Sequence, residues 1–244
     1  NNLIDSLSRV NKVIFYAETS HKLTIKYTNK MLTIISASVN IYLSKKVRED
    51  KLVSKKYEEL GITDAFMFAK VMSNKEICKP VLEQILNIKI RDIEYLDYEE
   101  TIQIAPGSKS IRLDIYVEDD NNTVFNLEMQ TTNYEELPKR SRYYQDIIDL
   151  KLIEKGQAYG ILKTSYVIFI CTFDFFEKNR SIYEFENICV DDSNIKLNDG
   201  THKIFLNTKG NRDGISEELQ MLLDYFDGRE PESQLAKDID RKVF

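Results

Sequence analysis

Two stretches of the chain, residues 110–118 and 123–131, largely alternate apolar and polar side chains, and this pattern restricts the fold more than any other feature. An alternation with a period of two predicts β-strands that each have one apolar face. The residues between them, 119–122, are all Asp or Asn, which favour turns. The two strands are therefore expected to form an antiparallel hairpin.

The register of this hairpin follows from the apolar side chains. They must lie on the same side of both strands, because a slip of one residue turns every side chain to the other face. The pairing that also keeps the loop short sets Val117 beside Phe125, Ile115 beside Leu127, and Leu113 beside Met129. On the polar face it sets Asp114 opposite Glu128, Arg112 opposite Gln130, and Tyr116 opposite Asn126.

The opposed carboxylates of Asp114 and Glu128 suggest a metal site. Directly paired residues have Cβ atoms roughly 4.5–5.5 Å apart, so two carboxylates there repel each other unless a cation lies between them. Mg²⁺ is usually held by one or two carboxylates together with water and phosphate oxygens, and it can activate water against a phosphodiester. Gln130 points to the same side and could position that water. The alternative is a polar face in contact with solvent, which the pattern by itself favours.

The rest of the chain alternates helical and extended patterns, which predicts an α/β fold with helices packed on a sheet. A helix is expected to follow Thr63, as its N-cap, and to run through Phe66, Phe68 and Val71. Further helices are expected at about 75–86, 139–154 and 216–225, and further strands at 93–104, 166–173, 182–190 and 203–207. The run 166–173 is almost continuously apolar, which is typical of a strand that is buried on both faces.

Composition excludes several kinds of protein. The three cysteines, Cys78, Cys171 and Cys189, are far apart, which indicates reduced thiols and a cytoplasmic protein. Only two histidines are present, too few for an ordinary structural zinc site. No apolar stretch reaches the roughly 18–20 residues of a membrane span, so no membrane partner is expected. The net charge of −6 means that a nucleic-acid partner would need positive charge gathered locally.

Several segments, in order, resemble one known family. The residues of 111–117 (IRLDIYV), 125–130 (FNLEMQ) and 140–145 (RSRYYQ) are similar to the recombination-promoting nuclease/putative transposase family of the PD-(D/E)XK nuclease superfamily. Segments 63–68, 166–173, 197–200 and 203–209 match as well, and the resemblance covers about residues 55–226. It implies a restriction-endonuclease-like core, with a mixed central β-sheet flanked by α-helices, and DNA cleavage that depends on Mg²⁺ or Mn²⁺.

The resemblance also assigns roles by position. Asp114 matches the metal-binding aspartate, Glu128 matches the acidic residue of the (D/E)XK element, and Gln130 stands in the place of its lysine. That is a departure from the pattern, because glutamine can hold a water but supplies no positive charge. Leu113 stands where the pattern has proline. Asp64 is either an additional metal ligand or a charge that stabilises the start of a helix.

DNA-binding residues are expected on the helix that follows the hairpin. Arg142 and Gln145, three residues apart and so on neighbouring positions of a helix, are candidates for phosphate contacts. Arg140 is a third candidate, with a solvated helix face as the alternative.

These patterns divide the chain and leave three functions open. Residues 1–54 are expected to be an extension, 55–226 a PD-(D/E)XK nuclease-like domain, and 227–244 a tail or the start of a further helical region. The leading hypothesis is a metal-dependent DNA endonuclease. A catalytically inactive DNA-binding or protein-interaction module is the alternative, and a cation that only stabilises the fold is a third. Whether the protein is a homo-oligomer is left open.

Overall fold

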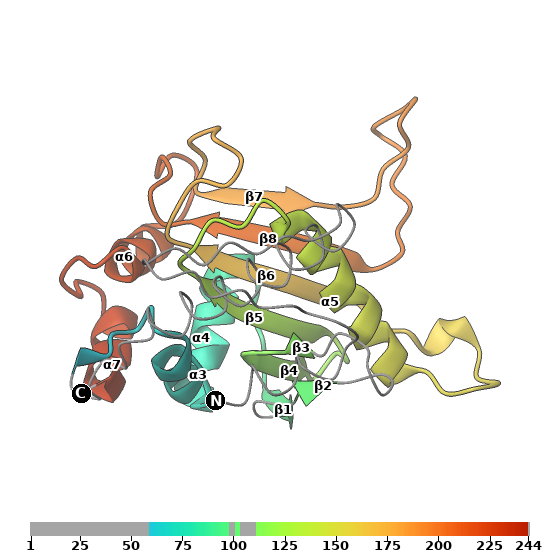
Figure 1. Ribbon diagram of the computed structural model, residues 1–244, viewed down its shortest axis with the longest axis horizontal. Helices are drawn as coiled ribbons and strands as arrows, with labels where there is room; N and C mark the ends of the chain where they lie inside the picture. Colours follow the sequence, from blue (N-terminus) through green and yellow to red (C-terminus); the bar gives the residue numbers. More distant parts are fainter. Residues whose placement is uncertain (1–58, 98–100, 103–110, 244) are drawn as a thin grey trace, which may run out of the picture. The chain divides into compact units, whose positions relative to one another are not determined.

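A mixed six-stranded β-sheet forms the centre of the computed structural model, which describes residues 59–97, 101–102 and 111–243 (Figure 1). Its strands, in spatial order, are β1 (Ile93–Asp97), β4 (Ile115–Asp119), β5 (Val124–Gln130), β6 (Ser165–Cys171), β8 (Thr201–Asn207) and β7 (Ile182–Phe185). β6 runs parallel to both β5 and β8, and the other neighbours are antiparallel. A separate pair is formed by β2 (Thr101–Ile102) and β3 (Ile111–Arg112). The predicted α/β fold with a mixed sheet is confirmed.

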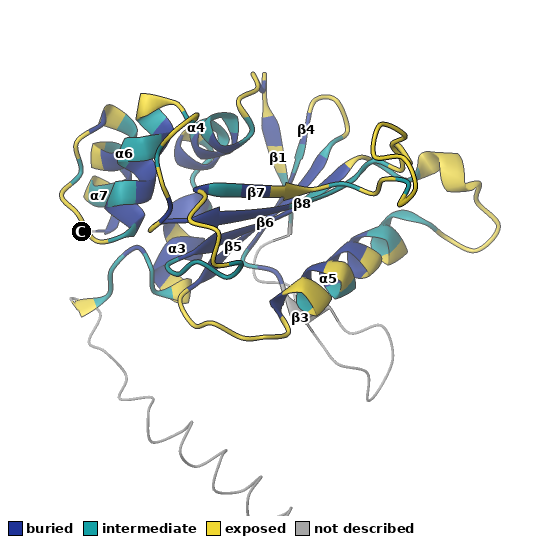
Figure 2. Cartoon of the chain, turned by 90° about the horizontal axis from the view of Figure 1, so that it is seen from above, coloured by how far each residue is buried: buried dark blue, intermediate teal, exposed yellow. Residues whose placement is uncertain are grey.

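Helices cover both faces of this sheet (Figure 2). One face packs against α3 (Ala65–Met72), α4 (Lys75–Leu86), α6 (Glu217–Phe226) and α7 (Gln234–Val243). The other face packs against α5 (Leu137–Leu152), and a 3₁₀ turn, η2 (Tyr159–Ile161), follows that helix. Alternate residues of β6 show the division, since Ile168 belongs to the four-helix side and Phe169 to the α5 side.

Local sequence signals explain where the helices begin. Asn74 caps α4 by accepting a hydrogen bond from the Glu76 N–H at 3.0 Å, and the Ser216 hydroxyl caps α6 in the same way. The prediction that Thr63 caps the first helix was wrong, because Asp64 holds that position. α5 begins at Leu137, two residues earlier than expected, with a proline in its first turn, where the missing N–H costs nothing.

Several predicted strands differ from their sequence patterns. The segment expected to be one strand at 93–104 contains β1 and β2, which belong to different sheets. The strand expected at 182–190 ends at Phe185, and beyond it the chain leaves the sheet and makes only an isolated bridge from Ile188 to Lys196. The strand expected at 110–118 is divided into β3 and β4 by a bend at Asp114. In contrast, most of the apolar run 166–173 forms β6, which is buried as predicted and lies between two parallel neighbours.

The two terminal segments predicted from the sequence differ in how far the structure describes them. The extension expected at residues 1–54 lies outside the described residues. Residues 234–243, within the segment expected to be a tail or the start of a further helical region, form α7, whose Ala236, Ile239 and Val243 join the same apolar core as α3 and α4. Across the described ranges, no helix combines the length and the apolar character that a membrane span requires.

Candidate active site

The β4–β5 hairpin has the predicted register as far as Ile115, the residue after Asp114. Ile115 pairs with Leu127, Tyr116 with Asn126, and Val117 with Phe125. The three pairs expected beyond Ile115 are not part of this ladder, so that part of the prediction was wrong. Asp114 lies in a bend, and Arg112 pairs with Thr101 in the small second sheet instead of with Gln130.

The bend has a physical cause in two reciprocal hydrogen bonds. The Asp114 N–H donates to Glu128 Oε1 at 3.0 Å, and the Met129 N–H donates to Asp114 Oδ2 at 3.3 Å. Each carboxylate thus binds the backbone of the opposite strand, which a regular ladder would not require. The predicted register brought the two carboxylates together, and they do lie together at the end of the hairpin, although not as a ladder pair.

The polar face of β5 is not solvated. Asn126 is fully buried, Glu128 is 1% exposed and Gln130 is 5% exposed. The alternative of a polar face in contact with water is therefore wrong for this strand. β5 lies between β4 and β6 in the sheet, and α5 covers the face that carries these three side chains. Polar groups buried in this way must be hydrogen-bonded, since leaving one unpaired costs roughly 1–3 kcal/mol.

Opposing effects act on the buried Glu128 carboxyl group. Oε1 accepts a hydrogen bond from Asn126 Nδ2 at 2.9 Å in addition to the one from Asp114, and Oε2 accepts one from Arg140 Nη2 at 3.1 Å. Burial and the nearby Asp114 carboxylate outweigh these partners and raise the pKa of Glu128 from 4.5 to about 8. Burial thus favours the protonated form of Glu128 unless a cation lies close to it.

Arg140 reaches into this site from α5. Its Nη1 donates to Gln130 Oε1 at 2.8 Å and its Nε donates to the Tyr144 hydroxyl at 2.8 Å, in addition to the Nη2 bond to Glu128. The guanidinium also lies over the rings of Tyr144 and Phe169, at 5.0 and 5.5 Å from their centroids. Burial opposes the charge, but the Tyr144 hydroxyl and the Glu128 carboxylate hold the pKa of Arg140 above its ordinary value.

The structure separates the two other residues predicted to bind DNA. Arg142 is exposed on α5. Gln145 is only 4% exposed, and its amide donates to the Ser165 hydroxyl on β6. Gln145 therefore presents almost no surface to a nucleic acid, because it faces the sheet while Arg142 faces solvent.

The structure also places Asp64, the possible further ligand, and reveals one supporting residue that was not predicted. Asp64 is at the start of α3, where its carboxylate accepts a hydrogen bond from the Gly61 N–H at 2.9 Å, and its role as a metal ligand stays a prediction. Asn126 supports Glu128 directly, although the sequence patterns did not single it out. Its signal was its place two residues before Glu128, on the same face of the strand.

The donor atoms at the hairpin end suit a hard divalent cation. Two carboxylates meet there, and carboxylate and carbonyl oxygens are the ligands that Mg²⁺ and Mn²⁺ prefer. The buried Asn126 Oδ1 atom also has no hydrogen-bond partner among the described residues. The residues present therefore fit such an ion.

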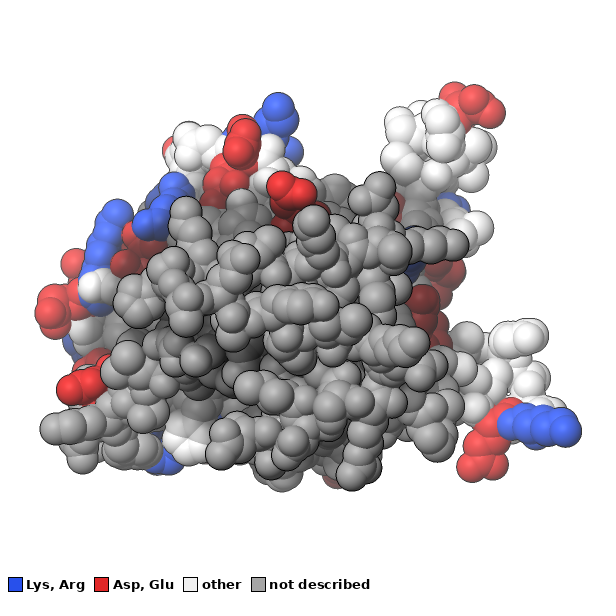
Figure 3. Space-filling model, viewed as in Figure 1, with Lys and Arg blue, Asp and Glu red and all other residues white. Residues whose placement is uncertain are grey.

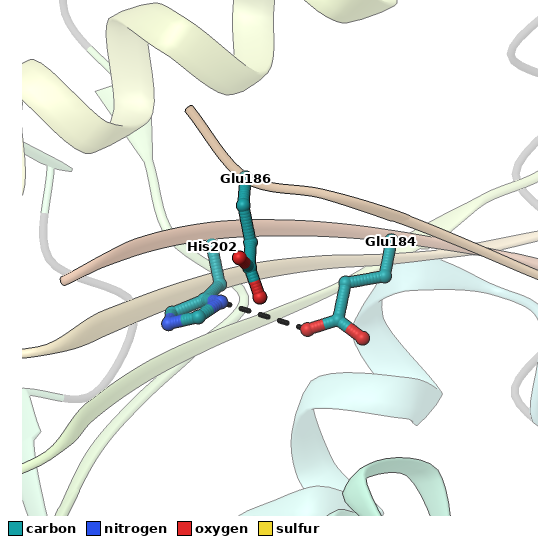
Figure 4. A group of neighbouring side chains, drawn as sticks. All are labelled: Glu184, Glu186 and His202. Atoms are coloured by element: carbon teal, nitrogen blue, oxygen red, sulfur yellow. Dashed lines mark ion pairs between the residues drawn. The ribbon is translucent and has the colours of Figure 1, made fainter. Parts of the chain in front are cut away.

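A second group of side chains with metal-binding atoms lies elsewhere in the sheet. Glu184, Glu186 and His202, on or directly beside β7 and β8, have ligand atoms within 4.8 Å of one another (Figure 4). Lys196 already pairs with Glu186 at 2.7 Å, and the His202 ring stacks on Tyr166. Both glutamates are exposed and Lys196 already pairs with one of them, so this group differs from the pair of Asp114 and the buried Glu128.

Comparison with curated proteins found no match. The sequence profile described as PD-(D/E)XK nuclease family transposase matches residues 65–224, which is more than half of the chain. The matched range contains all six strands of the central sheet and the cluster of Asp114, Glu128, Gln130 and Arg140. The chain therefore belongs to the PD-(D/E)XK nuclease family of transposases.

Proposed function

We propose that the protein is a divalent-metal-dependent DNA endonuclease whose cation is held by Asp114 and Glu128. The observation that carries this proposal is the carboxylate pair at the bend between β3 and β4, formed by the part-buried Asp114 and the buried Glu128, where each side chain binds the backbone of the opposite strand. When bound, Mg²⁺ or Mn²⁺ supplies positive charge that polarises a phosphodiester and activates water. A nuclease that cuts within DNA uses this chemistry.

The protein residues have separate tasks in this proposal. Asp114 and Glu128 provide the ligand oxygens, and Asn126 holds the Glu128 carboxyl in place through Oε1. The bend keeps the two carboxylates together without a flexible loop, so little reorganisation is needed when an ion binds. Asp64 remains a candidate for a further ligand.

DNA must be attracted despite the net charge of −6. On the face drawn in Figure 3, lysine and arginine side chains lie among aspartate and glutamate side chains around α6 and α7. We therefore assign DNA contact to local groups, Arg140 and the exposed Arg142 on α5, together with the bound cation. The three free cysteines fit a reducing, cytoplasmic setting.

A catalytically inactive DNA-binding module is the second candidate. Gln130 favours it, because the residue in the place of the lysine brings no positive charge. The retained carboxylate pair favours the nuclease, since a module that only binds DNA gains nothing from two adjacent carboxylates, which repel phosphate.

A cleavage assay on supercoiled plasmid distinguishes the nuclease from the inactive DNA-binding module. We expect nicked and linear products with Mg²⁺ or Mn²⁺, none with EDTA, and none from Asp114→Asn, which should still bind DNA in a gel-shift assay. The reason is that the asparagine removes one negative ligand but leaves the surface of α5 unchanged. Wild-type protein that binds DNA and Mn²⁺ but leaves the plasmid intact would support the binding module instead.

A further inference from the structure

We infer that Arg140 is the active-site cation of this protein, which supplies from α5 the positive charge that Gln130 lacks and binds the phosphate that is cleaved. This inference rests on the proposed endonuclease function. In this inference Gln130 on β5 and Arg140 on α5 together do what a lysine at position 130 would otherwise do.

The hydrogen bonds of Arg140 place its charge at the end of the Gln130 side chain. Gln130 Oε1 accepts from Arg140 Nη1 at 2.8 Å, and Gln130 Nε2 donates to the Thr132 carbonyl oxygen at 2.5 Å. Gln130 is thus held at both ends of its amide and orients the guanidinium. In this arrangement Gln130 is a positioning residue, in contrast to the water-holding role expected from its sequence position.

The guanidinium is fixed but not enclosed. Within the described residues its three hydrogen bonds use three of the five N–H groups, so two remain for another acceptor. The rings of Tyr144 and Phe169 hold its plane, while the side chain of Arg140 stays 32% exposed. A planar, fixed fork with spare donors is well suited to phosphate oxygens.

A purely structural role explains these contacts less well. If Arg140 served only to neutralise Glu128, a single ion pair would suffice, and neither the bond to Gln130 nor an open side would be required. Glu128 also has two other donors on Oε1, so Arg140 is not its only support. The two roles differ in one measurable respect. A structural Arg140 supports the metal site, whereas a catalytic Arg140 acts on DNA after the metal is bound.

The experiment compares wild type, Arg140→Gln, Arg140→Lys and the double variant Arg140→Gln/Gln130→Lys in the full chain. Cleavage of a duplex oligonucleotide gives kcat and KM, a titration with Mn²⁺ alone gives metal affinity, and thermal melting reports folding. Arg229→Gln is the matched control. It removes an exposed arginine that follows α6 and pairs with Asp224 of that helix.

We expect Arg140→Gln to lower kcat by roughly 10²–10³-fold, as the loss of one transition-state donor does in other enzymes. Its Mn²⁺ affinity should stay equal or increase, because a positive neighbour of the carboxylates is removed. Arg140→Lys keeps the positive charge without the planar guanidinium, so its kcat should lie between those of wild type and Arg140→Gln. The double variant should recover part of the lost rate by returning the charge to the strand. Arg229→Gln should cleave like wild type.

Two results would overturn the inference. One is wild-type kcat in a folded Arg140→Gln, and the other is loss of Mn²⁺ binding together with cleavage, which would make Arg140 a support of the metal site. If Arg140→Gln does not fold, loss of Mn²⁺ binding together with cleavage in Arg140→Lys would overturn it as well. Absence of cleavage by wild type itself is a different outcome, which rejects the proposed function and this inference with it.

Discussion

Replacement of Glu128 by glutamine is expected to reduce DNA cleavage by about a thousandfold or more. The variant loses a charged ligand of the cation, and the cation supplies several kcal/mol of transition-state stabilisation, where each ~1.4 kcal/mol corresponds to a factor of ten in rate. The fold should survive, because burial raises the pKa of Glu128 to about 8 and glutamine closely resembles the protonated acid. Plasmid cleavage in Mn²⁺ measures the first effect and thermal melting the second.

Glu94→Gln provides the control for this variant. Glu94 is an exposed carboxylate on the edge strand β1, so its replacement changes the net charge equally without affecting Asp114 or Glu128. We expect it to cleave DNA at the wild-type rate. Wild-type cleavage by folded Glu128→Gln would show that the carboxylate pair of Asp114 and Glu128 is not the catalytic centre.

The second large effect concerns pH and metal binding. A proton and a cation compete for the Glu128 carboxyl, whose pKa burial and the Asp114 carboxylate raise to about 8. Below that value, the apparent Kd for Mn²⁺ should increase about tenfold for each unit by which pH falls. Titration of wild type with Mn²⁺ at pH 6, 7 and 8 measures this dependence, and Glu94→Gln should show the same slope. A Kd that does not change across this range would contradict the assignment of Glu128 as a ligand.

The same shift has a consequence for stability without metal. Between its ordinary pKa of 4.5 and about 8, Glu128 binds more protons in the folded protein than in the unfolded chain. The free energy of unfolding contributed by this group therefore falls as pH rises through that window. Bound Mn²⁺ should remove the penalty, so the increase in melting temperature that Mn²⁺ produces should be larger at pH 8 than at pH 6.

The sequence predicted the hairpin but not the bend within it. The register from Ile115 to Val117 follows from alternating apolar residues, because only one pairing buries them all on one side. The bend at Asp114 depends on two bonds between side chains and backbone, which compete with the ladder and leave no trace in the hydrophobic pattern. Alternation thus located the acidic pair, while the geometry that joins it could only come from the structure.

The contacts of Arg140 with Glu128 and Gln130 could not be predicted from the sequence either. Arg140 follows Gln130 by ten residues, across a turn and the start of α5, so its direction depends on how that helix lies on the sheet. Packing on the sheet also buries Gln145 and leaves Arg142 exposed, although both were expected to contact DNA. Tyr144, Ile147 and Ile148 form the buried side of α5, and an apolar pattern of this kind does not show which polar residues share that side.

The location of bound metal tests the central claim most directly. Anomalous diffraction from crystals grown with Mn²⁺ would show the ion itself. We predict density within coordination distance of the carboxylate oxygens of Asp114 and Glu128. Mn²⁺ bound only at the exposed group of Glu184, Glu186 and His202, under conditions in which the protein cleaves DNA, would contradict this account.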